Sequence, residues 1–429
     1  MCILYAVSST SAVDIGNLAL DLLRLLTGAR LALSIAAPGW AVAQEVPAVV
    51  TREAAVESAL AHGPRLGLAR ADTALARAQL VSARARQNPV LATSYSKSTP
   101  QYHATLELPL GYPWLRRSRV ESAEAGREAA RYRFEFDRAA VAVEADTSYT
   151  HAAAAHAHAR LSRRNADDAD GLLRMALVRR DAGDASDLDV ALARLSAGQQ
   201  VNAAAADSLA FLSALLDLQA LMGLPADRVT ITVADSLPAP PAVDSTRRGG
   251  APLQIAAAQA SLRSAELAAR LQHRSALPTP NLTAGFETGD PSGAEPGILP
   301  TVGLSIPLPF LNRNQGPLAQ AEAERGRARA ELAVVQAEGE ARLAHAIRER
   351  EVALATIARD QSLLEAAERV AAMSLTAYHE GATSLPSVLE AQRNVRDIRS
   401  HFVDDLARAW IAGATARLFS LTSEASVSR

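Results

Sequence analysis

Apolar residues recur at spacings of three and four along two segments of the chain, 187–221 and 385–420. This spacing places the apolar side chains on one face of a helix and is typical of coiled-coil packing. In the first segment the apolar residues of this face are Leu188, Leu192, Leu195, Ala206, Leu209 and Leu216. In the second they are Leu385, Val388, Val395, Phe402, Leu406 and Ala409, with Gln392 and Arg399 as interruptions.

Each of these segments follows a much longer stretch without proline, 118–180 and 318–379. The stretches predict helices of about 63 and 62 residues, roughly 95 and 93 Å long at 1.5 Å per residue. A globular domain does not bury a helix of that length, so the long helices must pack side by side. Shorter helices predicted over 64–87 and 252–277 nearly complete that length when stacked on 187–221 and 385–420.

A period of two residues marks short segments ahead of each long helix. Apolar and polar side chains alternate over 104–110, 282–287 and 302–308. Such alternation puts the apolar side chains on one face of a strand, and segments of about ten such residues are typical of membrane β-barrels. The predicted membrane-facing side chains include Leu106, Leu108, Phe286, Leu304 and Ile306.

The number of strands has a consequence for assembly. Each half of the chain is expected to contain two strands ahead of its long helix. About four strands per chain leave unpaired edges that lipid does not tolerate, so three copies would have to close a barrel of about twelve strands. The alternative is a small soluble sheet at the end of a helical bundle.

The chain is internally duplicated. Pro109 and Pro307 occupy equivalent places in the strand segments and lie 198 residues apart, as do Gly183 and Gly381 in the turns after the long helices. A constant offset means that both long helices have kept the same length. We expect a first repeat over 44–222, a linker rich in proline and glycine over 223–250, a second repeat over 251–421 and a tail over 422–429.

The N-terminal segment has the features of an export signal. Arg24 and Arg30 precede the apolar residues 31–37, and Ala41-Val42-Ala43 precedes Gln44. This predicts a signal peptide over 1–43 that is cleaved after Ala43, with an N-terminal helix of a cytoplasmic protein as the alternative. Downstream we expect no apolar run close to the roughly 20 residues of a membrane helix.

Composition narrows the class of function. Hydrophobic residues make up 49% of the 429 residues but aromatic residues only 4%, which suits closely packed alanine- and leucine-rich helices. The net charge of −2 gives no electrostatic basis for binding nucleic acid or an anionic lipid surface. The one cysteine, Cys2, lies in the predicted signal, so we expect neither disulfides nor cysteine-ligated metals.

No motif predicts catalysis. His151 and His158 share a helix face, but seven residues span about 10.5 Å, too far for one metal ion to bridge. The carboxylates over 181–189 are too close in sequence to form a general acid and base around a substrate cleft. We therefore expect no enzyme, no cofactor and no metal site.

The doubled pattern of strands, long helix, glycine turn and shorter helix resembles the TolC family of outer-membrane efflux proteins. The most specific segments are the turns RDAGDASDLDV at 180–190 and YHEGATSLPSVLEA at 378–391. The segment IPLPFLNRNQG at 306–316 is similar to the strand-to-helix crossing of the CzcC-like branch, which serves heavy-metal efflux.

The resemblance implies roles for the two turns, at the periplasmic tip of a helical tunnel. Contact with a periplasmic adaptor protein is implied for Gly183, Ser186, Leu188, Gly381, Ser384 and Leu385. A tip gate is implied for Asp189 and Tyr378, which match a tyrosine–aspartate link, and for Glu390, which matches an acidic constriction. Ser387 and Thr383 stand where relatives carry an acidic residue and an arginine latch.

The same resemblance implies a mostly α fold, a long coiled-coil barrel continued by four membrane strands per protomer. It also implies a homotrimer in the outer-membrane lipid of a Gram-negative bacterium. This trimer would conduct metal cations, or drugs, passively from an adaptor and an inner-membrane RND-type pump. The alternatives are a soluble coiled-coil scaffold, which the strands disfavour, and a periplasmic adaptor, which the duplicated layout disfavours.

Overall fold

The computed structural model describes residues 49–234, 237–240, 251–275, 279–289 and 297–422. The predicted signal peptide, with Cys2, lies outside the described residues, as do 423–429 of the predicted tail. Residues 47–429 form one compact unit. This unit contains every element described below.

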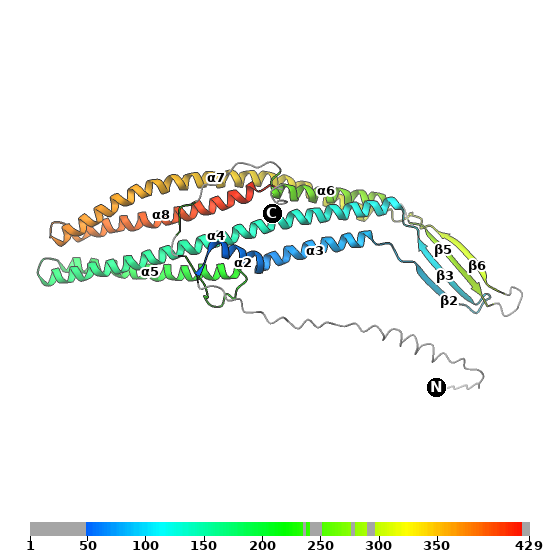
Figure 1. Cartoon of the computed structure of the whole chain (residues 1–429), viewed down its shortest axis with the longest axis horizontal. Coiled ribbons are helices and arrows are strands. Elements are labelled where there is room, and N and C mark those ends of the chain that lie inside the picture. The colour runs from blue at the N-terminus through cyan, green and yellow to red at the C-terminus, as the bar shows by residue number, and fades with distance from the viewer. Residues whose placement is uncertain (1–48, 235–236, 241–250, 276–278, 290–296, 423–429) are drawn as a thin grey trace, which may run out of the picture. The chain divides into compact units, whose positions relative to one another are not determined.

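Two helical hairpins form most of this unit (Figure 1). In the first, α4 (Pro113–Asp181) is followed by α5 (Asp187–Leu221), and in the second, α7 (Gln315–His379) is followed by α8 (Leu385–Ser420). The bounds of α5 and α8 are those predicted. Helix α4 begins five residues earlier than expected, because Pro113 stands in its first turn, where proline loses no hydrogen bond and presets the helical φ angle.

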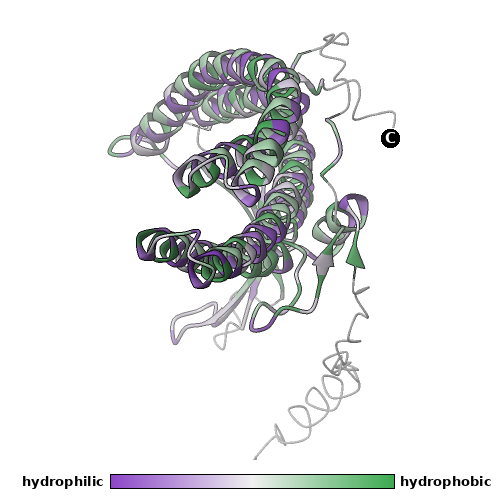
Figure 2. Cartoon of the chain, turned by 90° about the vertical axis from the view of Figure 1, so that its left-hand side faces the viewer, coloured by the Kyte–Doolittle hydropathy of each residue, from purple (hydrophilic) through white to green (hydrophobic). Residues whose placement is uncertain are grey.

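Three shorter helices complete the helical layer: α2 (Arg52–His62), α3 (Pro64–Arg84) and α6 (Leu253–Arg274). Helix α3 continues the line of α5 along α4, and α6 continues the line of α8 along α7, so stacked shorter helices accompany each long one (Figure 1). Seen along the helix axes, they form a curved layer (Figure 2).

The buried side chains between these helices are largely alanine. Ala145, Ala152 and Ala176 of α4 and Ala353 of α7 are fully buried, as is Ala409 of α8. Small side chains let the helix backbones approach closely along the whole length of the hairpins. This packing explains how the chain builds long helices with so few aromatic residues.

Four strands form an antiparallel sheet in the order β2-β3-β5-β6. They are β2 (Val90–Tyr95), β3 (Tyr102–Pro109), β5 (Asn281–Thr288) and β6 (Leu299–Ser305). The register aligns Leu91, Leu106, Ala284 and Val302 across all four strands. The next row aligns Leu108 with Leu282 and Leu304. One face of the sheet is therefore apolar and exposed.

The opposite face is polar. His103, Thr105 and Glu107 of β3 are paired with Glu287, Gly285 and Thr283 of β5. The His103 Nδ1 atom lies 3.4 Å from Glu287 Oε1. Both outer strands, β2 and β6, have one unpaired edge in this chain.

The prediction for Ile306 was wrong in one respect. Strand β6 ends at Ser305, which pairs with Asn281, the first residue of β5. Ile306 therefore has no partner residue in β5, and Pro307 after it cannot donate a ladder hydrogen bond. Ile306 is exposed beyond the strand end.

A two-stranded parallel sheet links the start of the unit to the linker between the repeats. Val49 and Val50 of β1 (Val49–Val50) pair with Thr232 and Val233 of β4 (Thr232–Val233). Val50, Ile231 and Val233 are buried.

Helix α5 corrects the expectation that no later segment resembles a membrane helix. Among the described residues it is the one helix long and apolar enough to cross a membrane, and its most apolar stretch is mostly exposed in this chain. Within the chain it packs against α4 as half of a coiled-coil hairpin. Its apolar surface is therefore largely uncovered in a single protomer.

Candidate functional site at the tip of the helices

The two turns that join the long and short helices end both hairpins at the same extremity of the unit (Figure 1). Gly183 has a φ angle of 84° and Gly381 one of 78°, values that favour glycine because it carries no Cβ atom. In each turn two backbone amides close the helix end: Gly183 N and Asp184 N donate to Arg180 O and Arg179 O, both at 2.8 Å. The glycines produce sharp reversals of the chain.

Helix α5, which follows the first turn, begins with a complete capping box. Ser186 Oγ accepts a hydrogen bond from Asp189 N at 3.1 Å, and Asp189 Oδ2 accepts one from Ser186 N at 3.0 Å. The Ser186 hydroxyl also donates to Asp189 Oδ2 at 2.8 Å. The carboxylate of Asp189, for which the resemblance implies a gate, is thus held at the start of α5 in its own protomer.

Helix α8, which follows the second turn, has no such box. Ser384 occupies the N-cap position of α8, but its side chain makes no capping hydrogen bond. Its hydroxyl lies 3.2 Å from that of Ser387, which occupies the place that Asp189 has in the first repeat. The side chain of Ser186 therefore caps its helix and that of Ser384 does not, and Ser387 offers no carboxylate to complete a capping box.

A small apolar cluster joins the two hairpins just behind the turns. Its buried members are Leu172, Ala176, Val190, Ala193, Tyr378, Leu385 and Val388. Leu385, one of the predicted tip residues, is 1% exposed and contributes to this cluster. Leu188 is 67% exposed and points away from it. The two leucines therefore have different roles.

Arg179 is the residue at the tip that the sequence did not single out. Its Nη1 atom donates a hydrogen bond to the backbone carbonyl of Tyr378, and its guanidinium lies 4.7 Å from the centre of the Tyr378 ring. Its Nη2 atom also lies 3.4 Å from Asp184 O in its own turn. One arginine thus connects both turns. The available signal was a basic residue in the last turn of a long helix, where unpaired carbonyls attract cations.

Tyr378 is buried, yet its hydroxyl has no hydrogen-bond partner among the described residues. Burial raises the pKa of Tyr378, the nearby Arg179 charge lowers it, and the Asp189 charge raises it. Asp189 is therefore close enough to influence Tyr378 electrostatically. The hydrogen bond implied by the tyrosine–aspartate link is not formed between these two residues within one chain.

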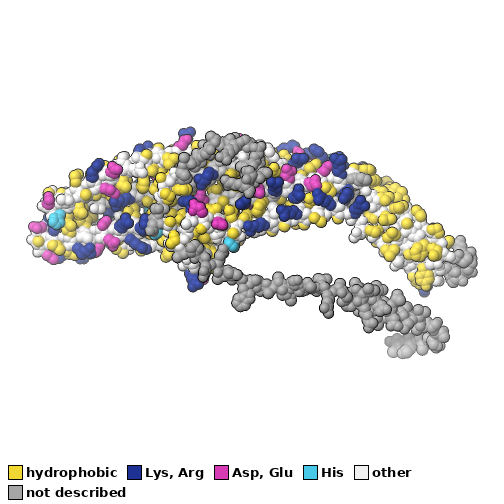
Figure 3. Space-filling model, in the orientation of Figure 1, with side chains coloured by type: hydrophobic (Ala, Val, Ile, Leu, Met, Phe, Trp, Pro, Cys, Tyr) yellow, Lys and Arg dark blue, Asp and Glu magenta, His cyan; other side chains and the backbone are white. Residues whose placement is uncertain are grey.

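The remaining gate residue, Glu390, is exposed on α8 and makes no ion pair within the described part of the chain. Acidic side chains gather at this end of the unit (Figure 3), with Asp181, Asp184, Asp187 and Glu380 exposed beside the turns. Asp181 accepts a hydrogen bond from Arg180 at 2.6 Å, which raises the pKa of Arg180. The tip surface is polar and largely acidic around an apolar centre.

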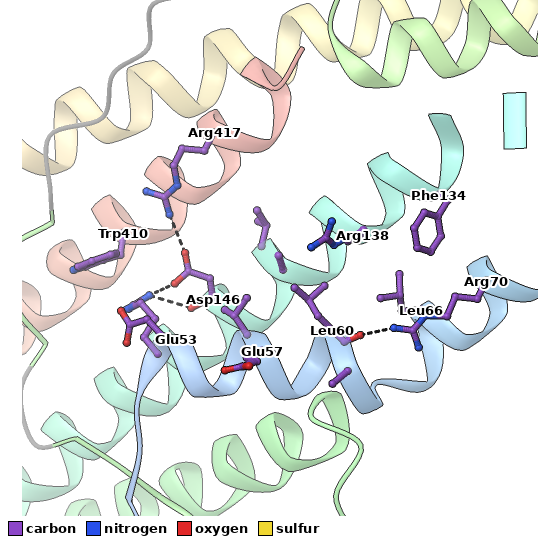
Figure 4. A pocket seen from close by; sticks show the side chains of 15 residues that line it. Glu53, Glu57, Leu60, Leu66, Arg70, Phe134, Arg138, Asp146, Trp410 and Arg417 are labelled. Carbon is purple, nitrogen blue, oxygen red and sulfur yellow. Dashed lines mark hydrogen bonds and ion pairs between the residues drawn. The ribbon is translucent and has the colours of Figure 1, made fainter. Parts of the chain in front are cut away.

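A groove of about 860 Å³ lies far from the tip, between α2, α4 and α8 (Figure 4). Arg52 donates to the carboxylate of Asp146 and, at 2.9 Å, to Thr150 Oγ1, while Arg417 donates to Asp146 Oδ2 at 2.9 Å. The Arg52 guanidinium also lies 3.9 Å from the Trp410 ring centre. These contacts tie three helices together, so the groove acts as a structural joint, while Arg52 Nη2 is buried without a hydrogen-bond partner among the described residues.

The histidines of α4 lie in different surroundings. His151 is exposed, His156 stacks on Phe211 with ring centres 4.6 Å apart, and His158 Nε2 lies 2.9 Å from Asp404 Oδ1. His151 is thus exposed, whereas His158 is paired with a carboxylate of α8. Among the described residues no group of three or more His, Cys, Asp or Glu side chains could hold a metal ion.

Long paired helices, a tip of two glycine turns and an open sheet with one apolar face define a subunit of a TolC-like channel. A family profile described as outer membrane efflux protein matches residues 55–224 and 252–421. The chain belongs to the outer membrane efflux protein family, and its location is the outer membrane.

Comparisons with individual proteins agree with this family assignment. The chain is 24% identical over 413 residues to the cobalt-zinc-cadmium resistance protein CzcC of Cupriavidus metallidurans, covering 91% of this chain and 98% of the relative. The outer membrane channel CmeC of Campylobacter jejuni superposes with a TM-score of 0.71 at 15% identity, covering 86% of this chain and 85% of that one. The outer membrane protein VceC of Vibrio cholerae superposes with a TM-score of 0.71 at 17% identity, covering 86% and 96%. These structures confirm the predicted fold class.

Proposed function

We propose that three copies of the chain form a channel that conducts metal cations passively from a periplasmic adaptor and an inner-membrane RND-type pump to the cell exterior. The observation that carries this proposal is the four-stranded sheet, with its exposed apolar face and two unpaired edges. In lipid each unpaired backbone group costs several kcal/mol, so β2 of one protomer must pair with β6 of the next. Three copies close twelve strands.

The helical part supports the same assembly. Val201, Leu209 and Leu212 on α5 are 57%, 66% and 46% exposed in one chain. A coiled-coil surface of this kind is stable when a neighbouring helix covers it. In the trimer, α5 and its counterpart in the second repeat would alternate around a tunnel.

Disulfide cross-linking tests the assembly. A cysteine at Val302 in β6 is combined with a cysteine at Leu91, Ala92 or Thr93 in β2, because the register between protomers is open. Oxidation of the outer-membrane fraction should give a ladder that ends at a covalent trimer for at least one pair. A cysteine pair at Leu282 and Ala284, which lie inside the sheet, is the control and should give no ladder. A ladder that ends at a dimer would contradict the proposal.

The substrate class rests on the similarity to CzcC, a cobalt-zinc-cadmium resistance protein, over nearly the whole of both chains. Deletion of the gene should lower the host's resistance to cobalt, zinc and cadmium ions, and the intact gene should restore it. Loss of resistance to organic drugs alone would overturn the metal assignment and leave the channel assignment standing. The chain itself performs no catalytic step in this scheme, and the pump supplies the energy.

We place the adaptor contact at Gly183, Ser186, Leu188, Gly381 and Ser384, with Leu385 supporting them from the core. Five of the six are exposed at the tip. A bulky Leu188→Glu substitution should reduce cross-linking to the adaptor, because it places a charge where an exposed leucine now offers apolar surface. The same change at Val178, which is 70% exposed on α4, serves as a control for a general loss of stability.

We propose that Tyr378, Asp189 and Glu390 gate the tip between neighbouring protomers. Their positions support this, because Tyr378 and Asp189 both lie at the tip and are close enough for the Asp189 charge to raise the pKa of Tyr378. Tyr378→Phe should raise the closed-state conductance in planar bilayers, and so should Asp189→Ala. Ser186→Ala, which removes the cap and keeps the Asp189 carboxylate, should leave it unchanged. Equal conductance in all three variants and the unaltered protein would refute the gate.

A further inference from the structure

The four crossings between strands and helices carry arginine and no acidic residue. The segments are 84–89, 110–119, 270–275 and 311–315. Their arginines are all exposed: Arg84, Arg86, Arg116, Arg117, Arg119, Arg270, Arg274 and Arg313. The chain as a whole has 44 basic and 46 acidic residues, so this local excess of positive charge reflects segregation along the molecule.

Only part of this charge is neutralised within the chain. Arg84 pairs with Glu124 at 2.9 Å and Arg117 with Glu121 at 2.8 Å, both acids lying one to two turns farther from the sheet. Among the described residues, Arg86, Arg119, Arg270 and Arg313 make no ion pair. Figure 3 shows basic side chains gathered over the ends of α3, α4 and α6, next to the sheet.

Exposed aromatic and apolar side chains lie at the same crossings. The rings of Tyr112 and Trp114 stack with centres 4.4 Å apart, and Trp114 is 48% exposed. Phe310 and Leu311, just ahead of α7, are 76% and 96% exposed. Trp and Tyr are enriched at membrane–water interfaces, where an apolar body and a polar edge are both accommodated.

We propose that this arginine girdle, the eight arginines together with Tyr112, Trp114, Phe310 and Leu311, binds anionic phospholipid headgroups of the leaflet next to the helices. The guanidinium fork matches phosphate oxygens and keeps its charge at any physiological pH. The apolar side chains enter the boundary of the acyl layer beside the apolar face of the sheet. The inference rests on the proposed barrel spanning a membrane.

The net charge of −2 led to the expectation that the chain has no electrostatic basis for binding an anionic lipid surface. The arginine girdle corrects this expectation. A membrane surface responds to charges within about a Debye length, roughly 10 Å at 0.1 M salt, and not to the sum over the chain. The acidic tip lies at the other end of helices about 100 Å long, since α4 has 69 residues. Its charge is screened from the leaflet.

The test compares phosphatidylglycerol with phosphatidylcholine binding to the purified trimer by native mass spectrometry. The variant R86Q/R119Q/R313Q removes three exposed arginines that have no ion pair in the described chain. The control R164Q/R194Q/R369Q removes three exposed arginines from the tip half of the molecule, for which the described residues likewise show no ion pair. Each arginine near an anionic surface contributes about fivefold to binding. The girdle variant should therefore bind phosphatidylglycerol more than about tenfold more weakly, with phosphatidylcholine binding and the control unchanged.

Equal phosphatidylglycerol affinity of the girdle variant and the unaltered protein would overturn the inference, as would an equal loss in the control. A changed ion selectivity in neutral-lipid bilayers, with lipid binding retained, would show that the arginines line the water-filled lumen, and would also overturn it. If the triple variant does not assemble, R119Q and R313Q are tested singly. Failure of the unaltered protein to form a conducting trimer would instead refute the proposed function.

Discussion

The guanidinium of Arg179 donates a hydrogen bond to the backbone carbonyl of Tyr378 and lies 4.7 Å from the centre of its ring. The same carbonyl accepts the bond from Gly381 N, at 3.0 Å, that closes the end of α7. The first hairpin therefore contacts the second at the atom that shapes the second turn. Together with the apolar cluster behind the turns, this contact couples the two hairpins at the tip.

Arg179→Gln should loosen the second turn. The variant loses a charged hydrogen bond, which contributes about 1.5–3 kcal/mol, and a cation–π contact of about 0.5–1 kcal/mol. The amides of Gly381 and Ala382 should then exchange with deuterium faster, at least about tenfold. Arg174→Gln, which removes an exposed ion pair with Asp170 on the same helix, should leave them unchanged. Unchanged exchange in both variants would show that the contact does not support the turn.

The two N-caps should respond differently to the same substitution. Ser186→Ala removes the hydroxyl that accepts from Asp189 N and donates to the Asp189 carboxylate, and should destabilise the start of α5 by about 1 kcal/mol. Ser384→Ala removes a hydroxyl that caps nothing and should cost only a few tenths of that. Hydrogen exchange at 187–190 and at 385–388 measures the two effects. Equal acceleration in both helices would contradict the assignment of the caps.

Asp146 should be far more important to stability than its neighbour Glu144. Asp146 is 11% exposed and holds Arg52 and Arg417, whereas Glu144 pairs with Arg65 at the surface. Asp146→Ala leaves two arginines without their carboxylate and should lower the free energy of unfolding by about 3–5 kcal/mol. Glu144→Ala should lower it by less than about 1 kcal/mol. Thermal unfolding of the trimer in detergent would test this, and similar midpoints for the two variants would refute it.

Asp405 should make the stability depend on pH. Burial raises the pKa of this α8 carboxyl, Arg408 and His401 lower it, and Asp360 and Asp404 raise it. The net shift is upward, so the folded state binds the proton more tightly than the unfolded state does. The contribution of protonated Asp405 to the free energy of unfolding is therefore fully present below a pH of about 3.8, and it is lost as the pH rises through the raised pKa.

Asp405→Asn remains neutral at every pH and should gain stability relative to the unaltered protein between pH 4 and pH 7. Denaturant unfolding at both pH values measures the difference. If the free energies of unfolding of the variant and the unaltered protein differ by the same amount at pH 4 and at pH 7, the raised pKa of Asp405 is contradicted.

Much of the architecture could be read from the sequence because it depends on contacts between residues close in the chain. The starts of α5 and α8 follow from Gly183, Ser186 and Gly381, each of which acts on the backbone within a few residues. The long helices follow from the absence of proline over more than 60 residues, as α4 and α7 confirm. The apolar face of the sheet follows from the period of two in β3, β5 and β6.

Other features were decided only by the tertiary structure. The Arg179–Tyr378 contact joins residues 199 apart, and no spacing within the sequence pairs them. The end of β6 at Ser305 was set by where β5 begins, which displaced Ile306 from the sheet. The eight arginines of the girdle are scattered over about 230 positions of sequence and become one surface only when four chain crossings meet beside the sheet. Local periodicity determined the elements of this protein, and long-range packing determined which of their side chains meet, because sequence spacing specifies faces and only the fold brings those faces together.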